Sequence, residues 1–301
     1  MARLDDLARP RPRLSDALDE WLASETVSVL RSPAYATSPS VDFASALVSL
    51  VSRFPSTRVP MKLNDHERRI FEDRGLLHLK RLIPKTKTKA AKEAIFGELT
   101  RLGVRAAGKW HSSKFPRQLR HQPEFDSVIP DDLLSCLIGL AGCKLALAQA
   151  RPQILLTPPQ SSTWSVPHLG WHLDVASPAR DEIPGIQAFV LIDDIVPQGG
   201  GTVAISGSHK LHSLRGGVAI SAHRVLQEDS GFAALFAPGT GDRREALASK
   251  LVNGVTVQVT EMSGEAGGVY LMDMRTIHAP ATNATRNLRI MLTCRYISQW
   301  Q

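Results

Sequence analysis

The spacing of apolar residues changes character near the middle of the chain. Before about residue 143, apolar residues recur at helical spacing. This pattern predicts helices over 14–31, 43–52, 87–104 and 131–142. Another helix is expected after Asn64, because Glu67 follows it three residues later in a capping-box sequence, and it should end near Gly75. The alternating segment 75–84 predicts a strand that stops at its proline.

From about residue 143 onward, short apolar runs bounded by Gly and Pro replace the helical pattern. The runs are KLALAQA, PQILLTPP, GIQAFVLIDDI, GTVAIS, NGVTVQVTEM, GGVYLMDM and NLRIMLTCRYI. Such a succession indicates a β sandwich or barrel. A long, Gly-containing and partly helical insertion at about 213–252 interrupts the runs, and connections of that length are usually lids or binding loops.

These patterns predict two units of different character. Residues 1–62 carry no chemical motif and are interpreted as a helical N-terminal extension. Residues 63–301 are expected to form an α+β domain with a mainly β core and flanking helices.

Composition narrows the class of protein. The 301 residues are 43% hydrophobic and 22% charged, which is ordinary globular composition. The net charge of +7 permits a nucleic-acid partner, but the Lys- and Arg-rich stretches lack interleaved aromatic residues for base stacking, which argues against one. The 3 cysteines form no CxxC pair, as in a reducing compartment. The start of the sequence lacks the apolar region of a signal peptide and no run approaches a membrane span, so a cytoplasmic enzyme is expected.

The candidate chemistry begins at His172 and Asp174 in the segment GWHLD. On an extended backbone, residues i and i+2 point to the same side, so this pair aims an imidazole and a carboxylate at one point. They are two of the ligands of a 2-His-1-carboxylate triad, which holds Fe(II) and leaves adjacent positions open. His278, expected at the end of the strand that begins with GGVYLMDM, is the candidate for the second histidine.

Arg289 follows His278 by 11 residues. If 279–286 is a turn and the next strand returns antiparallel, Arg289 lies beside the strand that carries His278. A buried guanidinium requires an anionic partner, and a dicarboxylic co-substrate chelating the metal at its other end would supply it. Arg286 and Arg295 compete for this role, and strand parity does not exclude Arg295.

At this point three segments resemble the phytanoyl-CoA dioxygenase family. They are GWHLDV, GGGTVAISGSHKLH at 199–212, and GVYLMDMRTIHAPATNATRNLRIMLTCRY at 268–296. The resemblance covers roughly 63–296 and implies a double-stranded β-helix (a cupin-like jelly roll). It implies that His172, Asp174 and His278 bind Fe(II) and that Arg289 pairs with 2-oxoglutarate. The implied reaction uses O2 and releases succinate and CO2.

The sequence also departs from the family's pattern. Pro280 stands where a serine often follows the distal histidine by two residues, and Val190 stands where a tryptophan is frequent. Gln153 and Thr202 are therefore considered as further 2-oxoglutarate contacts, although Gln153 is equally consistent with a polar residue at a strand edge. Asp174 also argues against a halogenase, which would carry a small residue there.

Other histidines and one tryptophan receive structural interpretations. His168 is expected in a loop at the mouth of the pocket, with a metal ligand or a substrate contact as the alternative. His209 and His212, after a tight turn, are expected to be structural. Trp171 is expected to pack behind the triad.

The sequence thus predicts an Fe(II)- and 2-oxoglutarate-dependent oxygenase that hydroxylates or otherwise oxidises an unactivated C–H bond of a small organic molecule, in secondary metabolism. The alternatives are a nucleic-acid- or protein-modifying oxygenase on the same scaffold and a non-catalytic cupin-like metal-binding protein. The substrate and the oligomeric state stay open.

Overall fold

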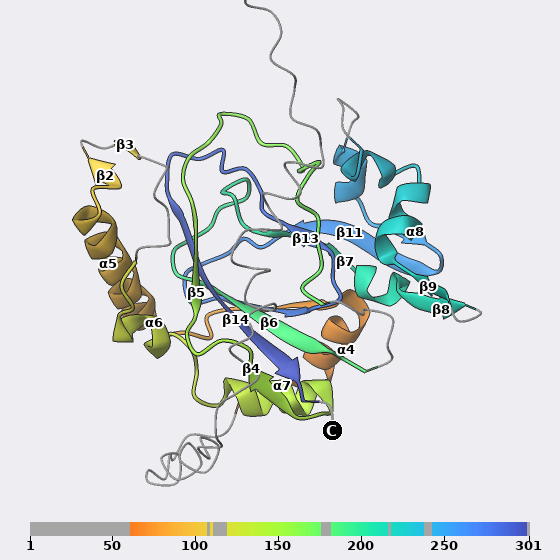
Figure 1. The fold of residues 1–301 in the computed structure, drawn as a ribbon, viewed down its shortest axis with the longest axis horizontal. Coiled ribbons are helices and arrows are strands. Elements are labelled where there is room, and N and C mark those ends of the chain that lie inside the picture. Colours follow the sequence, from red (N-terminus) through yellow and green to blue (C-terminus); the bar gives the residue numbers. More distant parts are fainter. Residues whose placement is uncertain are drawn as a thin grey trace, which may run out of the picture. The chain divides into compact units, whose positions relative to one another are not determined.

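The computed structural model describes residues 61–106, 109–110, 119–175, 182–215, 218–237 and 243–299. Backbone contacts divide the chain into two units, Met1–Arg58 and Val59–Gln301, and the described residues all belong to the second. The helices predicted over 14–31 and 43–52 lie outside the described residues. The described residues combine helices with two main β-sheets, and their paired strands run antiparallel (Figure 1).

The larger sheet has six strands. Its order is β1 (Leu76–Leu79), β12 (Val269–Asp273), β6 (Gly185–Leu191), β14 (Arg289–Ser298) and β4 (Leu145–Leu147), with β5 (Gln153–Thr157) also paired to β14. The long strand β14 holds this sheet together, because it pairs with β6 along one edge and with β5 and β4 along the other.

The smaller sheet has four strands. Its order is β10 (Lys250–Val252), β11 (Val255–Glu261), β7 (Val203–Ser206) and β13 (His278–Ala279). Gly207 ends β7 with φ +88°, and a Cβ there would lie 2.2 Å from the Thr256 carbonyl oxygen, so the turn requires glycine. Two hairpins lie outside both sheets, β2 (Arg105–Ala106) with β3 (Lys109–Trp110), and β8 (Ser213–Arg215) with β9 (Val218–Ile220).

Alternation along β6 and β14 decides which side chains face which layer. Ile186, Ala188 and Val190 of β6 pack in a cluster with the helices, whereas Phe189 and Leu191 belong to a second cluster. That second cluster also holds Ala204 of the smaller sheet, so the two sheets share an apolar layer. The same face of β14 carries Arg289 and Arg295, which have the parity of Met291 in this layer.

Helices cover the outer faces of both sheets (Figure 1). The larger sheet packs against α4 (Asp65–Arg74), α5 (Lys85–Arg101), α6 (Pro123–Ser127) and α7 (Leu133–Ala141). The smaller sheet packs against α8 (Ala222–Glu228) and the 3-10 turns η4 (Ser208–Leu211), η5 (Ala233–Leu235) and η6 (Arg244–Leu247). Among the described residues, no helix combines the length and the apolar character needed to cross a bilayer.

Several predictions from the sequence pattern are confirmed. Asn64 accepts a hydrogen bond from the Glu67 backbone while the Glu67 carboxylate accepts one from the Asn64 backbone, which is the predicted capping box. Gly75 ends the helix in the left-handed conformation at φ 61°. Each of the seven apolar runs after residue 143 contains a strand. The strand expected over 75–84 is shorter, Leu76–Leu79.

Two predictions about strand placement are wrong. β12 ends at Asp273, and His278 begins a separate short strand in the smaller sheet instead of ending the same one. Arg289 lies in the larger sheet, paired opposite Thr157, so it is not beside the strand that carries His278. The residues between the two strands pass from one sheet to the other, whereas the prediction assumed a simple hairpin.

Candidate metal centre

His172 and His278 meet through their backbones. They form an isolated antiparallel bridge in which each residue's N–H donates to the other's carbonyl, at 2.9 and 3.1 Å. Residues paired in this way place their side chains on the same face, and the two imidazole centroids lie 4.1 Å apart. The bridge therefore joins a loop segment near residue 172 to the smaller sheet, although the two histidines are 106 positions apart in sequence (278 − 172).

The same type of contact orients both imidazole rings, in which Nδ1 faces the backbone carbonyl of the residue two positions earlier. His172 Nδ1 lies 2.7 Å from the Gly170 carbonyl oxygen, and His278 Nδ1 lies 3.2 Å from the Thr276 carbonyl oxygen. A carbonyl only accepts, so Nδ1 carries the proton in each neutral ring and Nε2 keeps its lone pair. A second-shell acceptor of this kind is typical of metal-binding histidines.

Asp174 completes the group. One ligand atom from each of His172, Asp174 and His278 lies within 4.8 Å of the others. Asp174 Oδ2 is 3.5 Å from His278 Nε2, and the two side chains are 10% and 5% exposed. The three residues expected from the sequence to bind one metal therefore converge, and they offer two nitrogens and one oxygen. This donor set is the one associated with non-haem Fe(II).

Burial keeps His278 in the form that can bind a metal. Burial is the main cause that lowers the pKa of His278 to about 4, and the neighbouring His172 lowers it further while Asp174 opposes the change. The ring is therefore neutral near pH 7, and its Nε2 is available.

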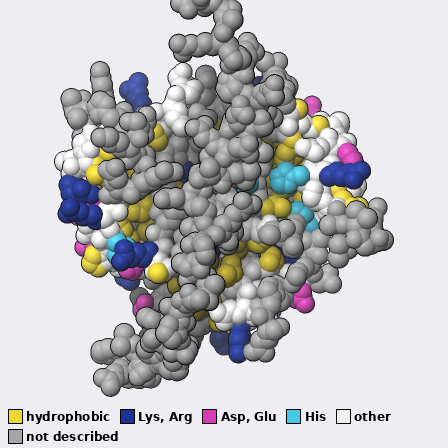
Figure 2. Space-filling view, in the orientation of Figure 1, with side chains coloured by type: hydrophobic (Ala, Val, Ile, Leu, Met, Phe, Trp, Pro, Cys, Tyr) yellow, Lys and Arg dark blue, Asp and Glu magenta, His cyan; other side chains and the backbone are white. Residues whose placement is uncertain are grey.

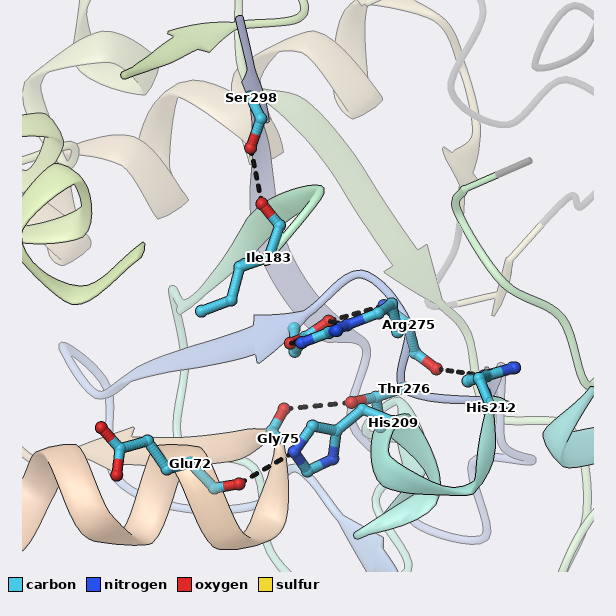
Figure 3. Close-up of polar contacts among 9 residues, drawn as sticks. Glu72, Gly75, Ile183, His209, His212, Arg275, Thr276 and Ser298 are labelled. Atoms are coloured by element: carbon cyan, nitrogen blue, oxygen red, sulfur yellow. Dashed lines mark hydrogen bonds and ion pairs between the residues drawn. The ribbon is translucent and has the colours of Figure 1, made fainter. Parts of the chain in front are cut away.

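The turn before His278 is anchored to α4 and η4 (Figure 3). Thr276 Oγ1 donates to the Gly75 carbonyl, His212 Nε2 donates to the Arg275 carbonyl, and His209 Nε2 donates to the Glu72 carbonyl. His209 and His212 thus have the structural role expected of them. Together these contacts fix the backbone that leads into the bridge.

Arg289 is buried between backbone carbonyls. Its Nε donates to the Gly200 carbonyl at 2.7 Å and its Nη1 to the Leu155 carbonyl at 3.1 Å. Burial lowers the pKa of Arg289 to about 10, and the charge of Glu261 partly offsets this. Glu261 is itself desolvated, which raises its pKa, although it accepts hydrogen bonds from the Gln198 and Gly201 backbones. The guanidinium remains charged at pH 7 on the inner face of β14.

Gln153 and Thr202 differ in their placement relative to Arg289, because the β14 partner of Gln153 is four residues further along the strand. Gln153 pairs opposite Thr293 on β14, which shares the parity of Arg289, so its side chain projects from the same face of the sheet. Thr202 is buried and follows the Gly200 backbone that Arg289 contacts. A polar contact from either side chain to a bound acid stays a prediction.

Val190 and Pro280, the two positions that depart from the phytanoyl-CoA dioxygenase pattern, lie in different surroundings. Val190 packs in the cluster under the helices, so it does not line the space between the sheets. Pro280 is exposed and lies near Gly170. Trp171 packs with the outer cluster of the smaller sheet and its ring centroid is 6.3 Å from that of Phe236, which agrees with a position behind the triad. His168 is exposed.

The drawn face of the molecule shows histidine side chains among hydrophobic ones (Figure 2). Lys and Arg side chains of the described residues occur there as separate groups (Figure 2). A continuous basic stripe, which a nucleic-acid track requires, is not formed by the described residues of this face.

Sequence reasoning missed the roles of two polar residues, Glu261 beside Arg289 and Arg295 beside Asp174. Glu261 ends β11 without any motif around it, and only its position in the fold brings it to the backbone beside Arg289. Arg295 was considered only as a competitor of Arg289, whereas its Nε donates to Asp174 Oδ2 at 3.2 Å. The sequence did indicate its direction, because Arg295 and Arg289 are an even number of residues apart on one predicted strand and therefore share a face.

Comparisons with known proteins give the fold. No protein-family model matches the sequence, and no curated protein is significantly similar to it. The solved structure of the non-heme alpha-ketoglutarate-dependent carbocyclase SnoK from nogalamycin biosynthesis is 18% identical, with TM-score 0.51 over 80% of this chain and 87% of SnoK. HygX from Streptomyces hygroscopicus, with nickel and 2-oxoglutarate bound, is 15% identical, with TM-score 0.51 over 80% of this chain and 89% of HygX. The epimerase SnoN, in complex with Fe3+, alpha ketoglutarate and nogalamycin RO, is 16% identical, with TM-score 0.50 over 78% and 83%.

Proposed function

We propose that this protein is an Fe(II)- and 2-oxoglutarate-dependent oxygenase acting on a C–H bond of a small organic molecule. The observation that carries the proposal is the convergence of His172, Asp174 and His278, with one ligand atom of each within 4.8 Å of the others. The fold comparisons support it, because SnoK, SnoN and HygX are described with alpha-ketoglutarate and two of them with a bound metal. In this proposal the two facing sheets are the halves of a double-stranded β-helix.

The residues fit the metal on chemical grounds. Two neutral imidazoles with fixed tautomers and one carboxylate suit a first-row divalent ion, and three protein ligands leave coordination positions for a chelating acid and for O2. The bound iron would supply the oxidative decarboxylation of 2-oxoglutarate and the oxidation of the substrate.

The chain's own residues supply binding and orientation. The bridge between His172 and His278 holds two ligands at a fixed separation. Arg289 is the proposed partner of the distal carboxylate of 2-oxoglutarate, because it is a buried cation that retains donor groups suited to a carboxylate. The apolar layer between the sheets, which includes Phe189 and Met291, excludes water from the reacting groups.

Two finer assignments belong to the same proposal. The segments around His172 and His278 and the spacing to Arg289 support membership of the phytanoyl-CoA dioxygenase family. The occurrence of SnoK and SnoN in nogalamycin biosynthesis supports a role in natural-product tailoring. Asp174 as third ligand favours hydroxylation, desaturation or ring formation over halogenation.

The test uses the full-length protein with Fe(II) and 2-oxoglutarate. Without O2, the wild type should develop the visible charge-transfer band of an iron-bound 2-oxo acid. With O2, it should release succinate even without a substrate. The variants His172→Ala and His278→Ala should lose both signals, while His168→Ala, an exposed histidine four residues before the triad, should keep them. Succinate release from His278→Ala at the wild-type rate would falsify the assignment. Metal binding without any 2-oxoglutarate consumption would instead identify a non-catalytic protein.

A further inference from the structure

Arg295 projects from the same face of β14 as Arg289. The intervening residues Ile290, Leu292 and Cys294 pack under the helices, whereas Met291 belongs to the cluster between the sheets. Arg295, at the same parity as Met291, therefore points into the layer between the sheets. Its side chain is only 17% exposed. The strand thus carries two guanidinium groups on its inner face, six residues apart.

The contact made by Arg295 is with a triad member. Its Nε donates to Asp174 Oδ2 at 3.2 Å, and the same oxygen lies 3.5 Å from His278 Nε2. Among the described residues, Arg295 is the group that donates a hydrogen bond to the Asp174 carboxylate. Since Asp174 lies in a segment with no strand pairing beyond the bridge at His172, this bond is what sets the orientation of the carboxylate.

Gln187 lies directly opposite Arg295 in the pairing of β6 with β14. Thr293 Oγ1 donates to the Ala188 carbonyl at 2.9 Å and accepts from Gln187 Nε2 at 3.0 Å, which fixes the amide with its nitrogen toward Thr293. Gln187 is 2% exposed, and its Oε1 has no hydrogen-bond partner among the described residues. Opposed side chains on one face of an antiparallel pair are neighbours, so Gln187 lies next to Arg295, although its Oε1 forms no hydrogen bond with the guanidinium.

The charges of the described residues around the two arginines balance. Asp174 and Glu261 supply two negative charges, and Arg289 and Arg295 supply two positive ones. A divalent metal bound together with a dicarboxylate leaves this sum unchanged. Arg295 therefore lets a carboxylate be held in place before the metal arrives, with its charge already compensated.

We infer that Arg295 is a positioning residue that holds Asp174 in the orientation for binding a metal. The inference rests on the proposed function. It predicts in which direction the affinity for a divalent cation changes when the Arg295 side chain is removed. If Arg295 acted only through its charge, its removal would tighten the binding of a divalent cation, because a nearby positive charge is lost. If it positions Asp174, its removal weakens that binding, by roughly 10- to 100-fold for a second-shell partner.

The experiment is a calorimetric titration of the full-length apo protein with Co(II), followed by the visible spectrum of the Co(II) complex. Arg295→Gln should weaken Co(II) binding at least about tenfold and alter the d–d bands that report coordination geometry. Arg295→Lys, which keeps the charge and one donor, should recover part of the loss. Gln187→Met, which changes the neighbour of Arg295 at similar volume but removes no hydrogen bond to it, should bind Co(II) as the wild type does. Arg286→Gln, at an exposed arginine of the preceding loop, is the matched control and should bind as the wild type does.

The outcomes separate the two proposals. Co(II) binding by Arg295→Gln that is unchanged or tighter, with the wild type binding normally, overturns the positioning role and leaves the oxygenase assignment intact. A wild type that binds no Co(II) overturns both. If Arg295→Gln does not fold, as judged by near-UV circular dichroism, Arg295→Lys decides, because Co(II) binding by this variant at or above the wild-type affinity overturns the inference.

Discussion

Asn283 allows the clearest quantitative prediction, because it shapes the connection between the strand of His278 and the strand of Arg289. Its side chain is fully buried. Nδ2 donates to the Thr157 carbonyl at 2.9 Å and to the Asn287 carbonyl at 2.7 Å. Oδ1 accepts from Thr285 N at 3.0 Å and from Thr285 Oγ1 at 2.7 Å. One amide therefore uses both of its ends to hold the loop against β5.

The expected cost of Asn283→Ala follows from these bonds. A net value of about 1 kcal/mol for each gives about 4 kcal/mol, and water can replace part of this at the half-buried Thr285, so the free energy of unfolding should fall by about 3 kcal/mol. For a unit of this size the melting temperature should fall by roughly 6–12 °C. Asn283→Asp should be at least as harmful, because a carboxylate would face the two carbonyls that now accept from Nδ2.

The assay is urea unfolding followed by circular dichroism, with Asn287→Ala as control. Asn287 is exposed and takes part through its backbone only, so its truncation should change stability by less than about 0.5 kcal/mol. The reasoning is refuted if Asn283→Ala costs less than about 1 kcal/mol, or if the two alanine variants are equally destabilised. Because the loop sets the position of Arg289, Asn283→Ala should also weaken 2-oxoglutarate binding.

Three further predictions address pH, backbone strain and the co-substrate. Burial lowers the pKa of His212 to about 4, so the unfolded chain takes up a proton first, and this group's contribution to stability is lost as pH falls from about 6.5 to about 4. His212→Gln should remove on the order of 3 kcal/mol of that pH dependence in urea titrations, and identical pH profiles for variant and wild type would contradict this. Gly207→Ala should destabilise by over about 2 kcal/mol more than Gly254→Ala, because both positions have positive φ but only the first Cβ meets a backbone atom, the Thr256 oxygen at 2.2 Å. Equal melting temperatures for the two would refute the steric argument. Arg289→Lys should raise the apparent KM for 2-oxoglutarate by roughly tenfold or more, with unchanged Co(II) affinity. A rise in KM accompanied by a loss of Co(II) binding would contradict the assignment of Arg289 as a contact of 2-oxoglutarate alone.

The sequence was sufficient wherever a local rule decides the outcome. The capping box at Asn64, the runs that became strands and the spacing of His172 and Asp174 all follow from period and propensity. It was insufficient where one segment crosses from one sheet to another. His278 and Arg289 were expected on neighbouring strands, yet they lie in different sheets. The periodicity of a strand does not specify which partner it pairs with.

The polar residues beside Arg289 and Arg295 were hard to predict for the same reason. Glu261 and Gln187 sit in runs whose alternation already explains them as strand residues. Only the register of β6 with β14 puts Gln187 opposite Arg295, and only the turn before β7 brings the Gly201 backbone to Glu261. Register depends on the whole sheet, so single-sequence patterns leave it open.

The reciprocal backbone bonds of His172 and His278 have a consequence for which ion the isolated protein would contain. A pair of ligands that is rigid before any ion arrives does not select strongly among ions that accept the same geometry, and affinity then follows the Irving–Williams series. Copper, nickel and zinc would outcompete iron at equal concentration. The identity of the native ion would then be decided by which metals the cell leaves available, and preparations purified in air would require stripping and anaerobic reloading before any turnover is measured.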